Sequence, residues 1–519
     1  MRAHRATPWG WLSARGLALS GAWLGVLTYV IPPGLVDEAV GDGLAWEVRL
    51  RSLPARFTAY FVLGLCLFTA EPYQGVARQV TAGLERALAA AGWRCPATTA
   101  LSGARARLGE EPLRSLFTRL CSPLSAGTAG WSHAGGLLMV AWDGTSLAVA
   151  DSPANAAAFG RPSAPRKRKA AAGQPAPPAE GVPHLRLVAL VACGTRALLG
   201  AAIGPFTGKG AGEPALAAQL LGSLRPGMLL LADRNFYSWK LWHDAAATGA
   251  HLLWRLKSII RLAPLQELPD GSWLARIDDP RAVQARLHKN GHRRRRGSKL
   301  PPDASPLPGG TTVRVIDYHL AITADDGTTR TERYRLITTL LDWRAHPAPS
   351  LAAAYSQRWA IESGYRECKA YLRGSGRLLR ARTPGLARQE AWALLAVYQA
   401  IRTLIARAAA RDGTDPDRVS FTTALHATRR TLKTPRHQLA ATLEATEAEI
   451  LQTLIPERPG RIYPRAVTRH ATHYPYRRSA TDPISHHASH ALTITPQATT
   501  THTPPHQAKQ PGNTATQPP

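Results

Sequence analysis

Two aspartates that follow apolar runs are the first residues that could do chemistry. Asp143 follows the run at 137–142, and Asp233 follows the run at 228–232. We predict a buried β-strand for each run, so that both carboxylates lie at strand ends, a common place for catalytic groups in α/β sheets. An aspartate at a strand end is also an ordinary turn residue, so neither residue identifies a site by itself.

A polar stripe on a predicted helix supplies the third carboxylate. At 100° per residue, Tyr355, Arg358, Glu362 and Lys369 fall within a stripe roughly 60° wide. Such a stripe is either a solvated face with pairs such as Arg358 and Glu362, or a surface that offers a carboxylate to a metal ion and cations to phosphates. Helix geometry alone leaves both interpretations open.

The three carboxylates together match the needs of metal-dependent phosphoryl transfer. Two Mg²⁺ ions about 3.5–4 Å apart require shared oxygen ligands of the kind that Asp143, Asp233 and Glu362 would supply. Arg358 and Lys369 would then hold the phosphates of the substrate.

The spacing of these residues is similar to a known signature. Asp143-Gly144-Thr145, the segment 232–236 and the complete Tyr-(2)-Arg-(3)-Glu-(6)-Lys pattern resemble the DDE transposases of the insertion-sequence-four family. The resemblance runs from about Leu24 to about Arg477, and residues 24–38 and 53–56 are similar to the N-terminal domain of that family.

The resemblance implies a fold and a set of ligands. The fold is α/β, with a ribonuclease-H-like catalytic core, a β-rich insertion between the second aspartate and the glutamate, and a helical N-terminal domain in front. Asp143, Asp233 and Glu362 would be catalytic and would bind two Mg²⁺ (or Mn²⁺) ions. Arg358 and Lys369 would contact phosphates at the transposon end.

Two tyrosines also receive roles from the resemblance. Tyr355 would help to hold the transposon strand. An aromatic residue of the insertion would stack on a base flipped out of the DNA end, and the corresponding strand places Tyr334 there. A tyrosine that merely covers a sheet face is the alternative for Tyr334.

The activity implied by the resemblance is DNA transposition. A metal-activated water would cleave at the terminal inverted repeats, and the freed 3′-OH would attack target DNA in a cut-and-paste reaction, by a hairpin route in the family. The partners would be double-stranded terminal-repeat and target DNA, bound by a homodimer, with the N-terminal helices reading the repeats.

The elements that must position these residues fall into a regular order. Between 137 and 256 we predict strand, strand, strand, helix, strand, helix, strand, which is an α/β sheet. Short alternating runs then indicate a β-rich insertion, and the chain is helical after Pro347. The predicted domains are a helical DNA-binding domain at 1–130, the first part of the core at 131–256, the insertion at 257–342, the rest of the core and the C-terminal helices at 343–478, and a disordered tail at 479–519.

The charge of the chain points to a polyanionic partner. Lys and Arg number 64 against 35 Asp and Glu, a net charge of +29. Nucleic acid is the first candidate partner and an anionic membrane surface the second. Basic runs at 166–169 and at Arg293, Arg294, Arg295 and Arg296 are solvated loops or non-specific phosphate contacts.

Two further features bear on location. The apolar stretch 16–36 is interrupted by Pro32 and Pro33, short of a full membrane span, so we predict buried helices there and at 57–70, and no membrane partner. Five widely spaced cysteines form no CxxC pair, which excludes a disulfide scaffold and disfavours a zinc knuckle. We expect a cytoplasmic, nucleoid-associated protein.

Three alternatives stay open at this stage. The chain could be a decayed DNA-binding repressor derived from a transposase, or a metal-dependent nuclease without strand transfer. A membrane protein is the third, and it rests on residues 16–36 alone.

Overall fold

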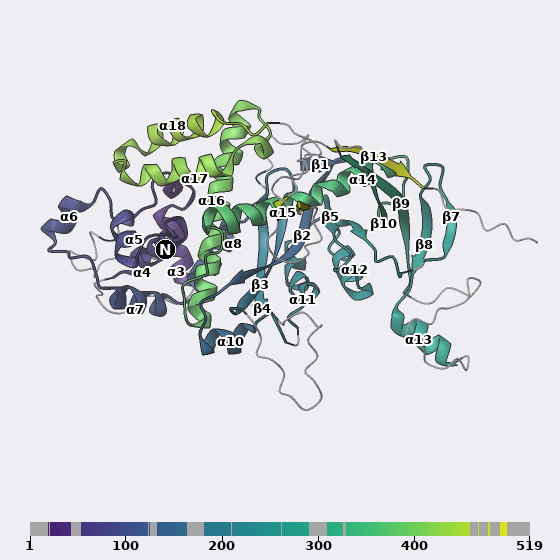
Figure 1. The fold of residues 1–519 in the computed structure, drawn as a ribbon, viewed down its shortest axis with the longest axis horizontal. Helices are drawn as coiled ribbons and strands as arrows, with labels where there is room; N and C mark the ends of the chain where they lie inside the picture. The colour runs from purple at the N-terminus through teal and green to yellow at the C-terminus, as the bar shows by residue number, and fades with distance from the viewer. Residues whose placement is uncertain are drawn as a thin grey trace, which may run out of the picture.

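The computed structural model describes residues 19, 21–42, 53–122, 124, 132–162, 181–208, 210–260, 262–289, 309–324, 329–456, 465–466, 476–477 and 488–495. Helices fill one end of the molecule, a mixed sheet lies in the centre, and antiparallel strands form the other end (Figure 1).

The described residues before 123 are helical. Their helices are α2 (Leu27–Val30), α3 (Pro33–Asp42), α4 (Ala55–Leu67), α5 (Tyr73–Val80), α6 (Glu85–Ala90), α7 (Thr98–Leu108) and α8 (Glu111–Leu120). Helix α4 is apolar on nearly every side because it is enclosed by the other helices and by α16 (Pro384–Asp412).

The apolar stretch near the N-terminus is buried, as predicted, but it is not one helix. Leu19, Leu24 and Leu27 have no exposed surface. Helix α2 covers only four residues, because the chain breaks at Ile31 before Pro33 opens α3, and proline fits best in the first turn of a helix.

The central sheet mixes parallel and antiparallel pairs. Its order is β4-β3-β2-β5-β6, with β2, β5 and β6 parallel to one another and β3 and β4 antiparallel to their neighbours. Its strands are β1 (His133–Ala134), β2 (Leu137–Ala148), β3 (His184–Ala192), β4 (Ala197–Pro205), β5 (Met228–Ala232) and β6 (His251–Arg255).

Both faces of this sheet are buried, which explains its apolar runs. Val140 and Trp142 face a core layer with α11 (Glu213–Ala217), the 3-10 helix η1 (Ala218–Ser223) and α12 (Trp239–Ala246). Met139 and Ala141 face the opposite layer, which includes α16. The predicted order of strands and helices is confirmed, with one addition: the prediction missed α10 (Pro153–Phe159), which Ser152 caps by accepting from the Asn155 N–H.

The strands after 257 extend the same sheet. They are β7 (Pro264–Glu267), β8 (Trp273–Ile277), β9 (Thr311–Ala324) and β10 (Thr329–Thr338), with α13 (Pro280–Lys289) between β8 and β9. Strand β10 pairs antiparallel with β6, so these strands are continuous with the central sheet. The sequence predicted their β-rich character but missed α13.

Helices follow β10. They are α14 (Ala348–Tyr355), the 3-10 helix η2 (Ser356–Arg358), α15 (Trp359–Arg366), the π-helix η3 (Glu367–Leu372), α16, the 3-10 helix η4 (Pro416–Arg418), α17 (Phe421–Arg430), the 3-10 helices η5 (Thr431–Lys433) and η6 (Arg436–Gln438), and α18 (Leu439–Leu451). Within the described residues, α16 is the one helix long and apolar enough to cross a membrane. Its apolar window is 83% buried inside the protein, as expected for a core helix.

The prediction of a wholly disordered tail is wrong for one segment. Residues 488–494 form β13 (Ala488–Ile494), which pairs antiparallel with β9; β11 (Arg465–Ala466) and β12 (Tyr476–Arg477) form a separate small pair. Strand β8 pairs only with residues 311–315 of β9, which leaves the backbone of 318–324 open to a partner. Leu492 and Ile494 alternate with polar residues and pack against the core. The rest of the predicted tail lies outside the described residues.

Candidate active site

Asp143 lies inside a strand rather than at its end. Strand β2 continues to Ala148, paired with β3, so the prediction of a strand end is wrong. The parallel neighbour β5 pairs only with residues 138–141 of β2, however. Asp143 therefore projects just beyond the paired region, at the same edge where Asp233 follows the last residue of β5.

The segment from 348 to 372 is not one regular α-helix. It passes from α14 through a 3-10 turn into α15 and then into a π-helix. Tyr355 is 4% exposed and Arg358 is 9% exposed, which excludes a solvated face for these two residues. The Tyr355 hydroxyl donates to the carbonyl of Ala232 at 3.2 Å, directly beside Asp233.

One buried guanidinium joins two of the three carboxylates. Arg358 lies 3.6 Å from Asp143 Oδ2 and 3.2 Å from Glu362 Oε1. Burial raises the pKa of Asp143 to about 6, although Arg358 and the Gly144 N–H both act to lower it. Burial acts to lower the pKa of Arg358, yet its pKa is raised because Tyr355 and the surrounding carboxylates, Asp233 included, outweigh that effect.

The donor chemistry of this group fits a divalent cation. Carboxylate oxygens are the ligands that Mg²⁺ and Mn²⁺ prefer. Within the described ranges, no three His, Cys, Asp or Glu side chains converge closely enough to hold an ion as they stand. Arg358 supplies the positive charge between Asp143 and Glu362 in this arrangement.

Lys369 and Tyr365 connect the helical segment to β2. The Lys369 ammonium donates to the Thr145 hydroxyl at 3.1 Å. The Tyr365 hydroxyl donates to the carbonyl of Asp143 at 2.7 Å and accepts from the N–H of Ala189 at 3.0 Å, so it bridges β2 and β3. Sequence reasoning missed Tyr365, although it lies one helical turn after Glu362 and so projects from nearly the same face.

Glu213 is a further carboxylate that sequence reasoning missed. It opens α11, forms an ion pair with Arg186 at 2.9 Å, and its charge helps to raise the pKa of Asp143. A Cβ on Gly144 would lie 2.2 Å from the Glu213 carboxyl carbon. The glycine of the Asp-Gly-Thr motif therefore makes room for this side chain.

Tyr334 is enclosed on both sides of its ring. It stacks on Tyr318 of β9 with ring centroids 5.0 Å apart, and the Arg255 guanidinium of β6 lies 3.9 Å from its centroid. Strand β10 runs between β6 and β9, so these partners cover opposite faces. Stacking of a DNA base on Tyr334 would require one of them to move. The predicted phosphate contacts Arg293, Arg294, Arg295 and Arg296 lie outside the described residues.

The sequence matches two family models. Residues 22–118 match the insertion element 4 transposase N-terminal domain, and residues 135–400 match the transposase DDE domain. The chain belongs to the DDE transposases of the insertion-sequence-four family. It is therefore a DNA transposase, an enzyme that processes DNA, and the DDE domain implies dependence on a divalent metal.

The transposase is similar to two proteins of Escherichia coli (strain K12) and to one solved structure. It is 26% identical over 457 residues to transposase InsG for insertion sequence element IS4 of Escherichia coli (strain K12), which covers 86% of this chain and 92% of InsG. The protein named putative transposase InsZ, of the same strain, is 27% identical over 209 residues, which cover 40% of this chain and 63% of InsZ. A piggyBac transposase synaptic complex with hairpin DNA aligns with a TM-score of 0.38 at 11% identity, over 84% of this chain and 86% of that chain.

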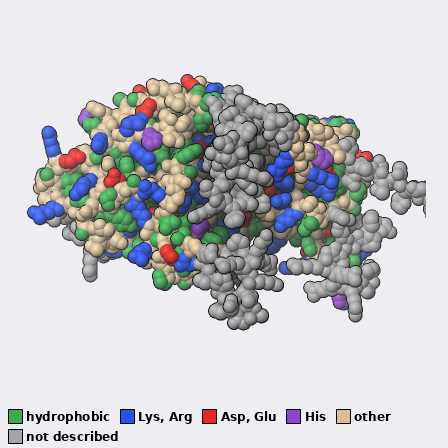
Figure 2. Space-filling model, in the orientation of Figure 1, with side chains coloured by type: hydrophobic (Ala, Val, Ile, Leu, Met, Phe, Trp, Pro, Cys, Tyr) green, Lys and Arg blue, Asp and Glu red, His purple; other side chains and the backbone are tan. Residues whose placement is uncertain are grey.

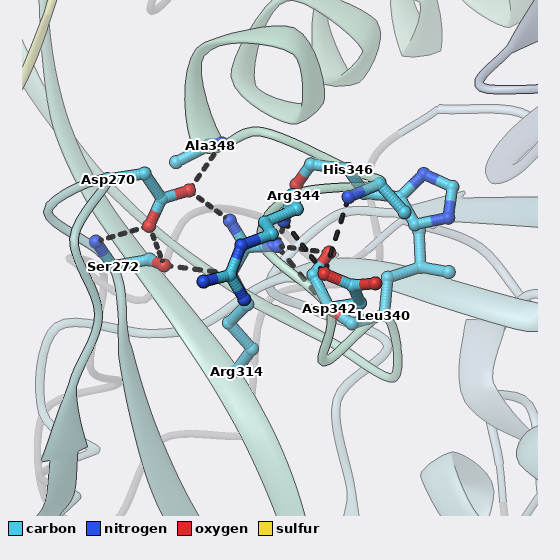
Figure 3. Close-up of polar contacts among 9 residues, drawn as sticks. Asp270, Ser272, Arg314, Leu340, Asp342, Arg344, His346 and Ala348 are labelled. Carbon is cyan, nitrogen blue, oxygen red and sulfur yellow. Dashed lines mark hydrogen bonds and ion pairs between the residues drawn. The ribbon is translucent and has the colours of Figure 1, made fainter.

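A buried cluster anchors the start of the helical segment in the transposase. Figure 3 shows the guanidinium of Arg314, from β9, among Asp270, Ser272 and the backbone of 340–348. Arg314 is fully buried, pairs with Asp270, and donates to the Ser272 hydroxyl at 2.8 Å and to the His346 carbonyl at 2.7 Å. Asp270 also accepts from the N–H of Ala348, the first residue of α14, at 2.8 Å. This Arg314 cluster ties the strands of 264–338 to the helix that ends at Tyr355.

We expect Arg314→Lys to lower the free energy of unfolding by about 1–3 kcal/mol, because a lysine cannot reach the acceptors that the planar guanidinium bonds together. Chemical denaturation measures the change. Arg333→Lys is the matched control, since the side chain of Arg333 is 62% exposed and 3.9 Å from Asp317. That control should change stability by less than about 0.5 kcal/mol, and equal losses in both variants would contradict a special role for the cluster.

Asp270 gives the transposase a dependence of stability on acid pH. Burial acts to raise the pKa of Asp270, but hydrogen bonds from Ser272 and the Ala348 N–H, with the charge of Arg314, bring the pKa below its ordinary value of 3.8. A carboxyl whose pKa is lower in the folded than in the unfolded chain stabilises the fold at pH values above the unfolded-state pKa. That stabilisation is lost as the pH falls below about 4. Urea denaturation of wild type and Asp270→Asn at pH 5 and pH 3 should show the smaller loss in the variant, and equal losses would refute the assignment.

Proposed function

We propose that this transposase cleaves at terminal inverted repeats and joins the freed 3′ ends to target DNA by a cut-and-paste route. The observation that carries the proposal is the pairing of Asp143 and Glu362 with one buried arginine, Arg358, beside Asp233. Three carboxylates from two strands and a helix are the ligand set that two-metal phosphoryl transfer requires.

The proposed catalytic core is ribonuclease-H-like. Its support is the strand order β4-β3-β2-β5-β6, with three parallel strands and two antiparallel ones, followed by the helix that carries Glu362. We propose the helical domain at 1–130, the insertion at 257–342 and the core segments at 131–256 and 343–478 as the working division of the chain.

The catalytic roles follow from the chemistry of the side chains. Asp143, Asp233 and Glu362 would hold two Mg²⁺ or Mn²⁺ ions, which supply a nucleophilic water and neutralise charge on the scissile phosphate. Arg358 and Lys369 would hold phosphates of the transposon end, and Tyr355 would fix the position of that strand beside Ala232. Tyr334 and the arginines 293–296 would add contacts to a flipped base and to the DNA backbone.

The charge of the surface supports DNA as the partner. The net charge of the chain is +29, and Figure 2 shows Lys and Arg side chains spread over both ends of the viewed face, with fewer acidic ones. We propose that a homodimer brings two transposon ends together, that the N-terminal helices read the repeats, and that the protein acts at the nucleoid in the cytoplasm. Affinity for DNA should fall steeply as salt rises.

A nuclease without strand transfer and a decayed repressor are the competing functions. The repressor is disfavoured because the six residues of the signature are all present and Arg358 interacts electrostatically with four of the others, Tyr355, Asp143, Glu362 and Asp233. No single contact separates the nuclease from the transposase, because both would use the same carboxylates.

The deciding experiment follows the products of a labelled terminal repeat. Purified protein is incubated with the repeat, Mg²⁺ and a supercoiled target plasmid. Cleavage together with joined product supports the transposition reaction, and cleavage without joining supports the nuclease. Binding without any metal-dependent product would overturn the catalytic proposal.

A further inference from the structure

A pocket beside the π-helix contains an unusual arginine. The pocket has a volume of about 180 Å³ and lies between the end of α4, the turn after η3 and helix α16. Its lining includes Leu65, Thr69, Arg373, Arg377, Arg380 and Glu390. The turn contains Gly374 and Gly376, whose φ angles of +93° and +73° favour glycine.

Within the part of the chain that the structure describes, two side-chain nitrogens of Arg373 are buried without a hydrogen-bond partner. Arg373 is 8% exposed, and its Nε and Nη1 atoms have no hydrogen-bond partner among the described residues. Buried donors without an acceptor are costly, and such groups in native proteins call for an unseen water, ligand or ion. Arg373 therefore lines the pocket with a guanidinium of which two nitrogens lack an acceptor in the described structure.

The other charged groups of the pocket already have partners. Arg377 donates to the Thr69 carbonyl at 2.8 Å, and Arg380 donates to the Glu71 carbonyl at 2.7 Å and the Thr69 carbonyl at 2.6 Å. Glu390 accepts from the Arg380 N–H at 3.1 Å and lies 3.6 Å from Arg105. The lining therefore holds three arginines and one carboxylate, Glu390, which also pairs with Arg105, so the pocket is positive and suits an oxyanion.

We infer that Arg373 builds an oxyanion pocket that takes a phosphate group of the transposon-end strand, next to the phosphate proposed for Lys369. Arg373 comes four residues after Lys369, and its charge acts to lower the pKa of Lys369, so the two cations lie close together. Neighbouring cations of this kind suit neighbouring phosphates of one strand. This inference rests on the proposed function, because the strand bound is the one that the transposase cleaves.

The pocket can be tested by thermal unfolding with inorganic phosphate as the probe, against chloride at equal ionic strength. Wild-type protein should gain thermal stability in phosphate and Arg373→Met should not. In chloride, Arg373→Met should be at least as stable as wild type, because it removes two buried donors that have no acceptor among the described residues. Equal responses of the two proteins to phosphate would overturn the pocket.

Binding of end DNA distinguishes a DNA phosphate from a free one. Arg373→Met should bind labelled end DNA about tenfold more weakly. The slope of the logarithm of its binding constant against the logarithm of salt concentration should be smaller by about one, as expected for the loss of one phosphate contact. Arg411→Met is the control, because the side chain of Arg411 is 57% exposed and paired with Glu447 at the far end of α16. If phosphate raises the thermal stability of wild type but Arg373→Met binds DNA with an unchanged salt dependence, the pocket does not take a phosphate of DNA.

A second variant covers a failure of Arg373→Met to fold. Arg373→Lys keeps the positive charge and should retain part of the phosphate response and most of the DNA affinity; loss of both in a folded Arg373→Lys protein would overturn the proposal. These measurements need no catalysis. If wild type binds phosphate and DNA through Arg373 but joins no DNA, the proposed function is refuted and the pocket is not. If wild type joins DNA but its binding does not depend on Arg373, the pocket is refuted and the proposed function is not.

Discussion

Asp233→Asn should reduce cleavage of a transposon end by at least about 10³-fold in Mg²⁺, because loss of the charge removes several kcal/mol of stabilisation from a two-metal reaction. Asparagine has nearly the same shape as aspartate, and Asp233 is half-buried at the end of β5. We therefore expect the variant to fold and to bind end DNA as wild type does. The measurement is the initial rate of cleavage on a labelled repeat, with binding followed separately by gel shift.

Asp244→Asn is the matched control for this variant. Asp244 lies on the next helix, α12, and pairs at the surface with Lys240 at 2.6 Å, one helical turn before it. Asp244→Asn removes one negative charge, as Asp233→Asn does, at a position close to Asp233 in the chain. The cleavage rate of this control should equal that of wild type. An Asp233→Asn protein that keeps a tenth or more of the wild-type rate would show that this carboxylate does not take part in the chemistry.

Arg358→Gln should be the second most damaging substitution, with two effects that can be measured independently. Removing the guanidinium leaves Asp143 and Glu362 without the cation that lies 3.6 Å and 3.2 Å from them. Because both carboxylates keep some contact with water, we expect a loss of about 1–3 kcal/mol in the free energy of unfolding without metal. Cleavage should fall by about 10²-fold or more, as expected when a charged contact to the reacting phosphate is lost.

Mg²⁺ should distinguish the two effects of Arg358→Gln. A divalent cation bound to the carboxylates would replace the lost positive charge, so Mg²⁺ should raise the midpoint of thermal unfolding more in the variant than in wild type. Arg366→Gln changes an exposed arginine at the end of α15, the helix that follows Arg358, and should behave as wild type in both assays. Identical responses of Arg358→Gln and wild type to Mg²⁺ would contradict the view that Arg358 and the metal ions share one group of ligands.

The spacing of residues was enough to predict which side chains meet, but not how they are held. The stripe of Tyr355, Arg358, Glu362 and Lys369 was derived for one regular helix. The actual segment contains a 3-10 turn and a π-helix, and it packs against β2 and the last residue of β5. Burial of Tyr355 and Arg358 followed from this packing, and no periodicity in the polar residues indicated it.

Contacts between distant segments account for the other differences. Arg314 interrupts an apolar stretch, Val313 to Ile316, which is a detectable signal of a buried charge, but its partner Asp270 is 44 residues away in the chain. The strand at 488–494 shows only two apolar residues at a spacing of two in a Thr-rich tail, and it forms because β9 has an open edge. Glu213 gave no signal in the sequence, since its proximity to Gly144 joins two segments that are about 70 residues apart in the chain.

The central claim, that Asp143, Asp233 and Glu362 hold the catalytic metal ions, is tested most directly by changing the metal preference of one ligand. Asp143→Cys replaces a hard oxygen ligand by a softer thiolate, which disfavours Mg²⁺ more than Mn²⁺. We predict that the variant cleaves end DNA negligibly in Mg²⁺ and regains measurable cleavage in Mn²⁺, while wild type is active in both. Cleavage by Asp143→Cys in Mg²⁺ at the wild-type rate would contradict the claim.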